Sequence, residues 1–439
     1  SVLFHLLSPW YFTPIASNWG AIDDTISLTF WVTGVVFVAV NLFMAYCVIR
    51  YRQRAGSRAE YEPENKKLEV WLVGLTTLGV IALLAPGLFV WASFVNVPQD
   101  AAVFEAVGKQ WHWSYRFPGA DGKLGTVDAR HVSDKNPFGM NPDDPNGQDD
   151  VLIASPEVHL PIGKPYKALL RSIDVLHNFS VAQFRVKMDL VPGLVTYIWF
   201  TPTRIGNFDL LCEELCGVAH YTMRGKVIVE EERAFQAWLS SYPTFAQTSA
   251  QAAGDAAAGK PLYAVCAACH GAQAEGNPAL HAPKLSGQGD WYLHRQLKSF
   301  KQGARGTHDK DIFGKMMAPM AATLGNDTAI DNVSAYIKTL PDNPAPATVK
   351  GNANNGQNLY VTTCGACHGS NGRGVQQMNA PGLKGMSDWY LVTQLKNFKQ
   401  GIRGAHPQDM YGPQMALMAA TMNDDQAIND LVAYINTLK

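Results

Sequence analysis

Two long apolar segments near the N-terminus give the first predicted elements. Residues 26–49 and residues 70–97 contain no Asp, Glu, Lys or Arg over 24 and 28 positions respectively. At about 1.5 Å of rise per residue, a helix of either length spans the hydrocarbon core of a bilayer, which is roughly 30 Å thick. The pattern therefore predicts two transmembrane helices, the second of them kinked at Pro86.

Basic residues gather in the segment between these helices and predict their orientation. The segment carries Arg50, Arg52, Arg54, Arg58, Lys66 and Lys67. No Lys or Arg precedes it, and none follows before Lys109. Because cytoplasmic loops are enriched in Lys and Arg, we expect a two-pass protein of the bacterial inner membrane. Residues 1–98 would be the lipid-embedded anchor, and both termini would lie on the outer, periplasmic side.

After residue 98 the pattern changes to short runs of β-branched residues interrupted by Pro and Gly, as in VLIASPEVHLPIG and KVIVE. Such runs are typical of a β-rich domain, which we place at residues 99–240. The stretch 119–150 is rich in Gly, Pro, Asp and Asn, so it predicts a long surface loop whose acidic residues form a solvated face. A polar, Ala-rich linker is expected at about 243–258.

The last third of the chain is an internal repeat. VCAACHG at 265–271 returns as TCGACHG at 363–369, and DWYLHRQLKSFKQGARG at 290–306 returns as DWYLVTQLKNFKQGIRG at 388–404. The offset is 98 residues throughout. The repeat predicts two similar small domains, residues 255–340 and 351–439, joined by the Pro-rich spacer PDNPAPATVK.

Composition narrows the class of protein. With 47% hydrophobic and 17% charged residues the chain is too apolar to be disordered, and its net charge of −1 offers no electrostatic footprint for nucleic acid. Seven cysteines are too few for a disulfide scaffold of this size, and six of them occur as closely spaced pairs. Such pairs point to attachment of a metal or a cofactor.

Each repeat carries the motif Cys-x-x-Cys-His. The residues are Cys266, Cys269, His270, Cys364, Cys367 and His368. In the attachment motif of a c-type haem, two thiols bond to the vinyl groups and the histidine binds the iron. Zinc binding and thiol redox chemistry are the alternatives, but neither needs the histidine or the methionine cluster that follows in both copies. One covalently bound haem c is therefore predicted in each repeat.

The repeat also narrows the choice of the sixth iron ligand. The 98-residue offset pairs Met317 with Met415 and Met320 with Met418. Both pairs occur at equivalent positions in the two copies, so the repeat alone does not decide between them. The other methionine of each copy would then be a packing residue, a common role for methionine.

Both copies resemble class I cytochromes c, especially tandem dihaem cytochromes, and this resemblance covers both domains. It favours Met317 and Met415 as iron ligands, with the other pair as packing residues. The family also has a proline whose carbonyl accepts a hydrogen bond from the haem histidine, and Pro283 and Pro381 match it.

The β-rich domain holds a second constellation, CEELCGVAHYTM at 212–223, with a histidine upstream in DVLHNFSV. Two thiolates, two imidazoles and a thioether favour copper over hard cations. The spacing of the thiols lets one loop place both sulfurs between two metal ions. A zinc site and a disulfide between Cys212 and Cys216 are the alternatives, although zinc has no use for the methionine.

Together with the N-terminal helices, this constellation resembles subunit II of the haem–copper cytochrome c oxidases over about residues 20–235. The resemblance implies a cupredoxin-like β-barrel with a dinuclear copper centre, CuA. Two cysteines would bridge the copper ions, each histidine would bind one ion, and a methionine and a main-chain carbonyl would be weak axial ligands. The implied ligands are His177, Cys212, Glu214, Cys216, His220 and Met223. The fold class is then multidomain: two transmembrane helices, a cupredoxin-like barrel and two all-α cytochrome c domains.

Three further assignments follow from the same resemblance. The Glu214 carboxylate would contribute to a magnesium site at the interface with subunit I. Trp111 in GKQWHWSYRF matches the tryptophan through which electrons enter, with His112 where a tyrosine is common. An aromatic run that only packs in the core is the alternative. Glu69 matches an acid at the mouth of a proton channel, and an ordinary helix-end glutamate is the alternative.

The implied function is that of the electron-accepting subunit of a proton-pumping cytochrome c oxidase, with the oxygen-reducing site in another subunit. Expected partners are oxidase subunits I and III and an external donor, such as a cytochrome c or a quinol-oxidising complex. Electrons would pass through the two c haems to CuA and on to subunit I. The electron-accepting subunit of a CuA-type nitric oxide reductase and a free-standing membrane electron carrier are the alternatives.

Charge and connectivity suggest an order for the two repeats. Residues 100–240 carry a net charge of −4, residues 255–340 one of +2 and residues 351–439 one of +1. Opposite charges favour docking, and the first repeat is joined directly to the β-rich domain. We therefore expect the first repeat to lie against the copper site and the second to face the external donor.

Overall fold

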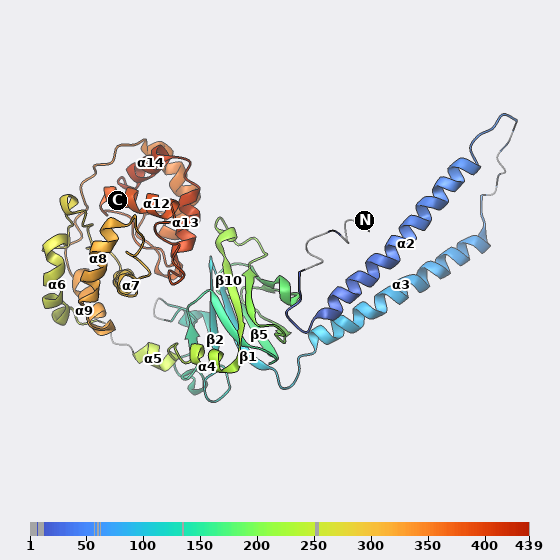
Figure 1. The fold of residues 1–439 in the computed structure, drawn as a ribbon, viewed down its shortest axis with the longest axis horizontal. Helices are drawn as coiled ribbons and strands as arrows, with labels where there is room; N and C mark the ends of the chain where they lie inside the picture. Colours follow the sequence, from blue (N-terminus) through green and yellow to red (C-terminus); the bar gives the residue numbers. More distant parts are fainter. Residues whose placement is uncertain are drawn as a thin grey trace.

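The computed structural model describes residue 7 and residues 13–438, except for residues 57, 59, 60, 62, 134, 135 and 251–253. Part of the predicted linker and the final residue, Lys439, therefore lie outside the described residues. Figure 1 shows a pair of long helices, a central β-barrel and a pair of helical domains. The two helical domains are called the first and second repeat domains below.

Two apolar helices extend away from the barrel, α2 at Gly20–Arg50 and α3 at Lys66–Val95 (Figure 1). Both are long and apolar enough to cross a membrane, and very little of their most apolar stretch is buried within the protein. They contain nearly all of the two charge-free segments, and Pro86 lies inside α3. Their exposed apolar side chains fit a two-pass membrane anchor.

The barrel holds the adjacent ends of both helices in place. Arg185 pairs with Asp23 at 2.7 Å, near the start of α2. The indole of Trp19 donates a hydrogen bond to the Trp199 carbonyl at 2.9 Å, and the Tyr197 hydroxyl donates to the Val95 carbonyl at 3.2 Å. These contacts fix the barrel against the end of the helix pair.

The β-rich domain consists of two five-stranded sheets, ordered β3-β2-β1-β5-β8 and β4-β10-β9-β6-β7. Neighbouring strands are antiparallel except for the parallel pairs β1–β5 and β4–β10. The strands are β1 Ala102–Lys109, β2 His112–Phe117, β3 Val151–Ile153, β4 Glu157–Pro161, β5 Tyr166–Ser172, β6 His177–Val181, β7 Val186–Leu190, β8 Val195–Phe200, β9 Gly206–Leu211 and β10 Arg224–Glu230.

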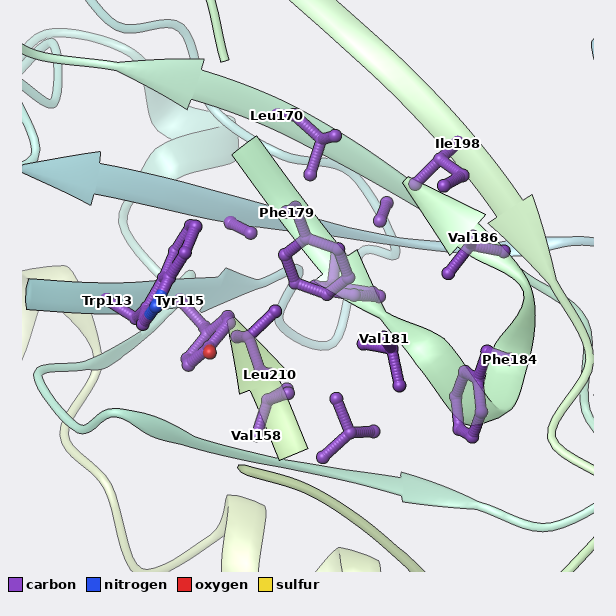
Figure 2. Close-up of a cluster of buried hydrophobic side chains, with 14 of the residues drawn as sticks. Trp113, Tyr115, Val158, Leu170, Phe179, Val181, Phe184, Val186, Ile198 and Leu210 are labelled. Carbon is purple, nitrogen blue, oxygen red and sulfur yellow. The ribbon is translucent and has the colours of Figure 1, made fainter. Parts of the chain in front are cut away.

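The barrel core fills the space between these sheets (Figure 2). Trp113 from β2, Phe179 from β6 and Leu210 from β9 are fully buried there. Strand β5 shows the reason for this placement, because its residues are alternately buried and half-buried as successive side chains point to opposite faces. Burial of each large apolar side chain contributes about 1.5–3 kcal/mol.

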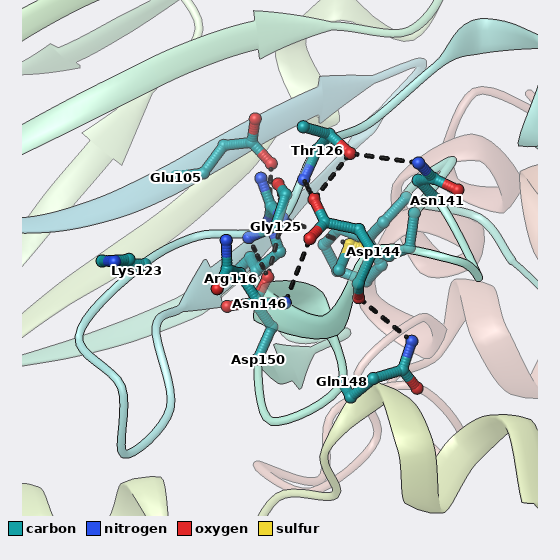
Figure 3. Close-up of polar contacts among 12 residues, drawn as sticks. Glu105, Arg116, Lys123, Gly125, Thr126, Asn141, Asp144, Asn146, Gln148 and Asp150 are labelled. Atoms are coloured by element: carbon teal, nitrogen blue, oxygen red, sulfur yellow. Dashed lines mark hydrogen bonds and ion pairs between the residues drawn. The ribbon is translucent and has the colours of Figure 1, made fainter.

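The stretch 119–150 differs from the predicted surface loop. It is irregular, but it covers a second small core that contains Phe138 and Met140. Beneath it, Arg116 pairs with Glu105 at 3.1 Å and with Asp150 at 2.8 Å, and all three side chains are buried (Figure 3). Sequence analysis missed this network because Arg116 and Asp150 lie 34 residues apart.

The predicted linker is also shorter than expected. After α4 at Glu232–Leu239, two main-chain hydrogen bonds join the following residues to the barrel. The Leu152 N–H donates to the Pro243 carbonyl, and the Phe245 N–H donates to the Asp150 carbonyl. Phe245 is buried at the start of α5, Phe245–Ala250. This apolar anchor keeps residues 243–250 on the barrel.

Both repeat domains are all-α, with a separate hydrophobic core in each. The first contains α6 Ala256–His270, α7 Asp290–Lys301, α8 Ile312–Ala322 and α9 Asp327–Lys338. The second contains α10 Ala353–Leu359, a π-helical turn at Tyr360–Cys364, α11 Gly365–His368, α12 Asp388–Lys399, α13 Gly412–Ala420 and α14 Asp425–Ile435. The predicted fold class is confirmed.

The two repeat domains join through a reciprocal set of hydrogen bonds between equivalent residues. Arg305 donates to the Tyr390 hydroxyl at 2.7 Å, and Arg403 donates to the Tyr292 hydroxyl at 3.1 Å. Each arginine also bonds to a glutamine of its own domain and to the equivalent glutamine of the other. This symmetry gives the pair a defined mutual orientation.

The second repeat domain, not the first, lies against the barrel. Figure 1 shows α13 beside the barrel and α6 on the far side of the pair. Met418 of α13 packs against the barrel core, and Gln414 donates a hydrogen bond to the Trp111 carbonyl at 2.7 Å. The expectation that the first repeat lies against the copper site is therefore wrong. A net difference of one charge is easily screened, whereas docking depends on specific contacts.

Candidate functional site

Neighbouring strands bring the predicted copper ligands to one end of the barrel. The loop 212–223 connects the antiparallel strands β9 and β10, and His177 begins β6, which pairs with β9. His177, Cys212 and Cys216 are buried, with possible ligand atoms within 4.8 Å of one another. The fold thus joins a histidine to two cysteines more than thirty residues later in the chain.

The two sulfurs lie at the centre of this group. Cys212 Sγ and Cys216 Sγ are 3.8 Å apart, which is too far for a disulfide, whose sulfurs lie about 2.05 Å apart. His177 Nδ1 is 3.9 Å from Cys212 Sγ, and His220 Nδ1 is 3.4 Å from Cys216 Sγ. Met223 Sδ is 3.9 Å from Cys216 Sγ. All side chains predicted to bind copper are therefore together.

The main-chain carbonyl of Glu214 completes the set, 3.3 Å from Cys212 Sγ. Glu214 is half-buried, whereas the Glu213 carboxylate forms an ion pair with Lys187 Nζ at 3.2 Å. The loop therefore places a main-chain carbonyl oxygen beside the two sulfurs, where it could serve as a further metal ligand.

Asp174 orients His177 and was missed by the sequence analysis. Its carboxylate is 2.8 Å from His177 Nε2, so a proton on Nε2 leaves Nδ1 to face Cys212. Burial alone would lower the pKa of His177, but the hydrogen bonds and charges of Asp174 and Cys212 together outweigh burial, and the pKa is raised. The spacing Asp-x-x-His in DVLHNFSV was the available signal, since metal-binding histidines usually donate to a carboxylate or carbonyl.

The donor set fits copper. The contact with Cys216 holds the pKa of the Cys212 thiol well below its ordinary value and raises that of Cys216, so Cys212 ionises first and Cys216 keeps its proton. A metal ion would displace that proton, because thiolates are the binding form. Two thiolates, two imidazoles and a thioether are soft to borderline donors.

Trp111 lies directly beneath this loop. It is 5% exposed, and its indole donates a hydrogen bond to the Cys216 carbonyl at 3.1 Å. Gln110 donates to the same carbonyl at 2.7 Å, and its main-chain N–H donates to Asp174 at 2.7 Å. The segment before β2 thus supports both the cysteine loop and the residue that orients His177.

The repeat domains hold their predicted haem histidines in equivalent surroundings. His270 Nδ1 is 2.7 Å from the Pro283 carbonyl, and His368 Nδ1 is 2.8 Å from the Pro381 carbonyl. This confirms the predicted proline acceptors and leaves Nε2 of each ring as the nitrogen that could bind a metal. Burial lowers the pKa of both histidines, which favours the neutral, metal-binding form.

A cavity of about 430 Å³ runs between the two repeat domains and reaches the barrel. It is lined by the Cys-x-x-Cys-His residues of both repeats, by Met317 and Met415, and by Trp111. A space bordered by paired thiols, an oriented histidine and a methionine fits a covalently attached haem in each domain.

The methionines of the second repeat divide between two roles. Met415 packs within the repeat's own core, whereas Met418 packs against the barrel and accepts a contact from the Tyr221 hydroxyl at 3.3 Å. This arrangement supports Met415 over Met418 as the iron ligand. In the first repeat Met317 packs into the core, and Met320 is 37% exposed.

Glu69 does not join either site. It lies in the first turn of α3, exposed at the far end of the helix pair from the barrel. Gln414, by contrast, is a contact that sequence analysis missed. The signal was its difference from Met316, the equivalent residue of the first repeat.

Comparison with known proteins identifies the families of the barrel and of the repeat domains. Residues 102–231 match the family described as the periplasmic domain of cytochrome c oxidase subunit II, and residues 256–341 and 353–439 each match cytochrome c. The chain is 63% identical over 249 residues to an alternative cytochrome c oxidase subunit 2 of Bradyrhizobium diazoefficiens, covering 57% of this chain and 90% of that protein.

Two further likenesses concern the repeat domains. A thiosulfate dehydrogenase electron acceptor of Stutzerimonas stutzeri is 34% identical over 176 residues, covering 38% of this chain and 76% of that protein. The crystal structure of cytochrome c4 from Pseudomonas stutzeri aligns with a TM-score of 0.35 at 31% identity, covering 43% of this chain and all of that chain.

A subunit II domain implies a CuA centre and association with subunit I, and cytochrome c domains imply covalently bound haem c. The relatives named cytochrome c oxidase subunit 2 are oxidoreductase subunits. The chain therefore belongs to the cytochrome c oxidase subunit II family, extended by two cytochrome c domains.

Proposed function

We propose that electrons from an external donor enter the first repeat domain, pass to the second repeat domain, reach the CuA domain and continue to subunit I. When bound, haem c and CuA supply one-electron transfer, and the chain's own residues hold and orient them. This order reverses the two repeats relative to the sequence-based expectation.

The observation that carries this proposal is a line of hydrogen bonds across the barrel interface. Gln414, next to Met415, donates to the Trp111 carbonyl, and the Trp111 indole donates to the Cys216 carbonyl. The line connects the axial methionine proposed for the second repeat with a cysteine proposed to bridge the copper ions. Such fixed contacts keep two redox sites close and constant in geometry.

The junction between the repeats supports the earlier step. The Arg305 and Arg403 side chains both line the shared cavity while bonding across the domain boundary. Because the same cavity is bordered by both haem histidines, the two cofactors would face a common interface.

The ligand assignments belong to the same proposal. One haem c would be held by Cys266, Cys269, His270 and Met317 and the other by Cys364, Cys367, His368 and Met415. CuA would be held by the six ligands of the barrel. Glu214 would supply a carboxylate to magnesium beside subunit I, and Glu69 would take up protons.

The domain limits and the orientation belong to it as well. The anchor, residues 1–98, would place the barrel and both repeat domains in the periplasm, and subunit III and lipid would complete the surroundings. The copper domain would run from residue 99 to about 250, since residues 243–250 pack on the barrel.

Flash photolysis of the purified complex tests the order. The c haems are reduced by a photoexcited electron donor, and the near-infrared CuA band is followed in time. Gln414→Ala should slow the reduction of CuA, whereas Met316→Ala, the equivalent change in the first repeat, should leave it unchanged. The opposite pattern would restore the first repeat as the immediate donor.

The same preparation separates the alternative functions. A co-purifying haem a signal supports an oxidase, and haem b with non-haem iron supports a nitric oxide reductase. The absence of both signals in an intact preparation supports a free-standing carrier.

A further inference from the structure

His112 lies where the second repeat domain meets the barrel. The centre of its ring is 5.1 Å from the centre of the Tyr411 ring, which belongs to the residue just before α13. Beside this contact, Gln414 of α13 donates to the carbonyl of Trp111, the residue that precedes His112. His112 does not line the cavity shared by the repeat domains, so its surroundings are formed by protein side chains.

The His112 ring carries polar atoms that the interface leaves unsatisfied. Both of its nitrogens are buried, and neither has a hydrogen-bond partner in the described part of the structure. A buried polar atom without a partner destabilises the fold, and the penalty is much larger when the group carries a charge. The interface therefore accommodates the neutral imidazole far better than the protonated one.

The charges that act on His112 have the same sign as a protonated imidazole. They belong to Lys109 at the end of β1 and to Arg295 of α7 in the first repeat domain. The Arg295 guanidinium is fixed in place, because it lies 4.6 Å from the centre of the Tyr411 ring and donates to Asn379 Oδ1 at 3.0 Å. A proton on His112 would therefore be repelled by cations from the barrel and from the repeat domains.

The acids on the two sides of this interface are bonded to other groups. Asp409 of the second repeat domain accepts the first main-chain N–H of α13 at 3.0 Å, and Asp174 of the barrel is bonded to the histidine that it orients. Burial, together with the charges of Lys109 and Arg295, lowers the pKa of His112 from 6.5 to about 3. A ring freed from the interface would face water and keep its ordinary pKa, so a proton binds the undocked form more tightly.

We propose that His112 is a positioning residue that receives the second repeat domain only in its neutral form, so that acid releases this domain from the barrel. The effect on electron transfer rests on the proposed function, because it requires the second repeat domain to be the immediate donor to CuA. Docking has its full strength above pH 6.5 and weakens about tenfold for each pH unit below that value, until the pH approaches 3. A tyrosine, common at this position in the family, would stay neutral throughout this range.

Hydrogen–deuterium exchange of the full purified complex tests the docking, with mass spectrometry of residues 111–113 and 411–414. After correction for the intrinsic pH dependence of exchange, the protection of both segments should fall about tenfold between about pH 7.5 and about pH 5.5. His112→Phe and His112→Tyr should show no such fall, because neither new side chain gains a proton in this range. His131→Phe, at another histidine of the barrel, should keep the full fall. Gln414→Ala should lower protection by one factor at both pH values, since an amide does not titrate.

Flash-driven reduction of CuA should slow between the same two pH values in the unaltered protein and keep its rate in His112→Phe. Constant protection in the unaltered protein, or an equal fall in His112→Phe, would overturn the proposal. A fall shared by the buried strand β6 would also overturn it, because acid would then be loosening the whole barrel. The expected pattern of protection with an unchanged rate of CuA reduction would support the pH-dependent docking and overturn the proposed function instead.

Discussion

Gln414 and Trp111, which are 303 residues apart in sequence, connect the second repeat domain to the barrel. The Gln414 side-chain amide donates to the Trp111 carbonyl at 2.7 Å, and both residues adjoin a proposed metal site. Few contacts in the described part of the chain bring residues so distant in sequence together. The contact explains why a short segment before β2 can influence both the copper loop and the second repeat domain.

Trp111→Phe should slow electron transfer from the c haems to CuA. The change keeps an aromatic ring but removes the indole N–H that donates to the Cys216 carbonyl. A hydrogen bond of this kind contributes about 1 kcal/mol, here to holding the loop in place. Flash-driven CuA reduction measures the effect. Trp113→Phe is the control, since Trp113 points into the barrel core and should lower stability without slowing transfer. Equal rates in both variants would contradict the role of Trp111.

Cys216→Ser should abolish the near-infrared CuA band while both c haems remain attached. The oxygen of serine is a hard donor and cannot replace a bridging thiolate. Absorption spectra of the purified complex give the result. Cys47→Ser, in helix α2 and away from the barrel, should leave the band intact. A persistent CuA band in Cys216→Ser would rule out the copper assignment.

Met317→Ala and Met415→Ala should each remove about half of the weak sulfur-to-iron absorption at the red end of the oxidised spectrum, because each haem would lose one axial thioether. Met320→Ala and Met418→Ala are the matched controls in the two repeats. They should retain that absorption, and Met418→Ala should instead weaken the contact with Tyr221. Loss of the absorption in the controls would exchange the two assignments.

Acid should weaken the barrel through Glu105. Burial would raise the pKa of Glu105, but the charges of Arg171 and Arg116 and their hydrogen bonds together outweigh burial and lower the pKa from the ordinary value of 4.5. A lowered pKa in the folded state means that the ionised form contributes stability above pH 4.5, and that this contribution is lost as the pH falls.

Glu105→Gln should therefore cost about 3–5 kcal/mol at neutral pH, because it leaves the buried Arg116 and the half-buried Arg171 without the carboxylate they share, and it should reduce the loss of stability in acid. Thermal loss of the CuA band at several pH values measures both effects. Glu157→Gln, on the exposed side of β4, should change neither. A Glu105→Gln barrel as acid-sensitive as the unaltered one would disprove this account.

The sequence by itself determined the elements whose chemistry is local. Charge-free runs predict the two membrane helices because length and apolarity alone decide whether a helix can span a bilayer. Cys-x-x-Cys-His and the 212–223 segment indicate the cofactor sites because most of the ligands of each site lie within one short segment of chain. The 98-residue repeat predicts two alike domains and narrows the methionines to two pairs.

Only the tertiary structure decided how these units meet. Which repeat domain lies against the barrel depends on particular contacts by Tyr411, Gln414 and Met418. The net charges of the two repeats, +2 and +1, cannot reveal these contacts. Asp174 beside His177 and Asp150 beside Arg116 likewise become partners only through strand pairing and loop packing. Docking and burial depend on how the shapes and polar groups of distant segments match. Patterns of residues close together in the sequence cannot predict that match.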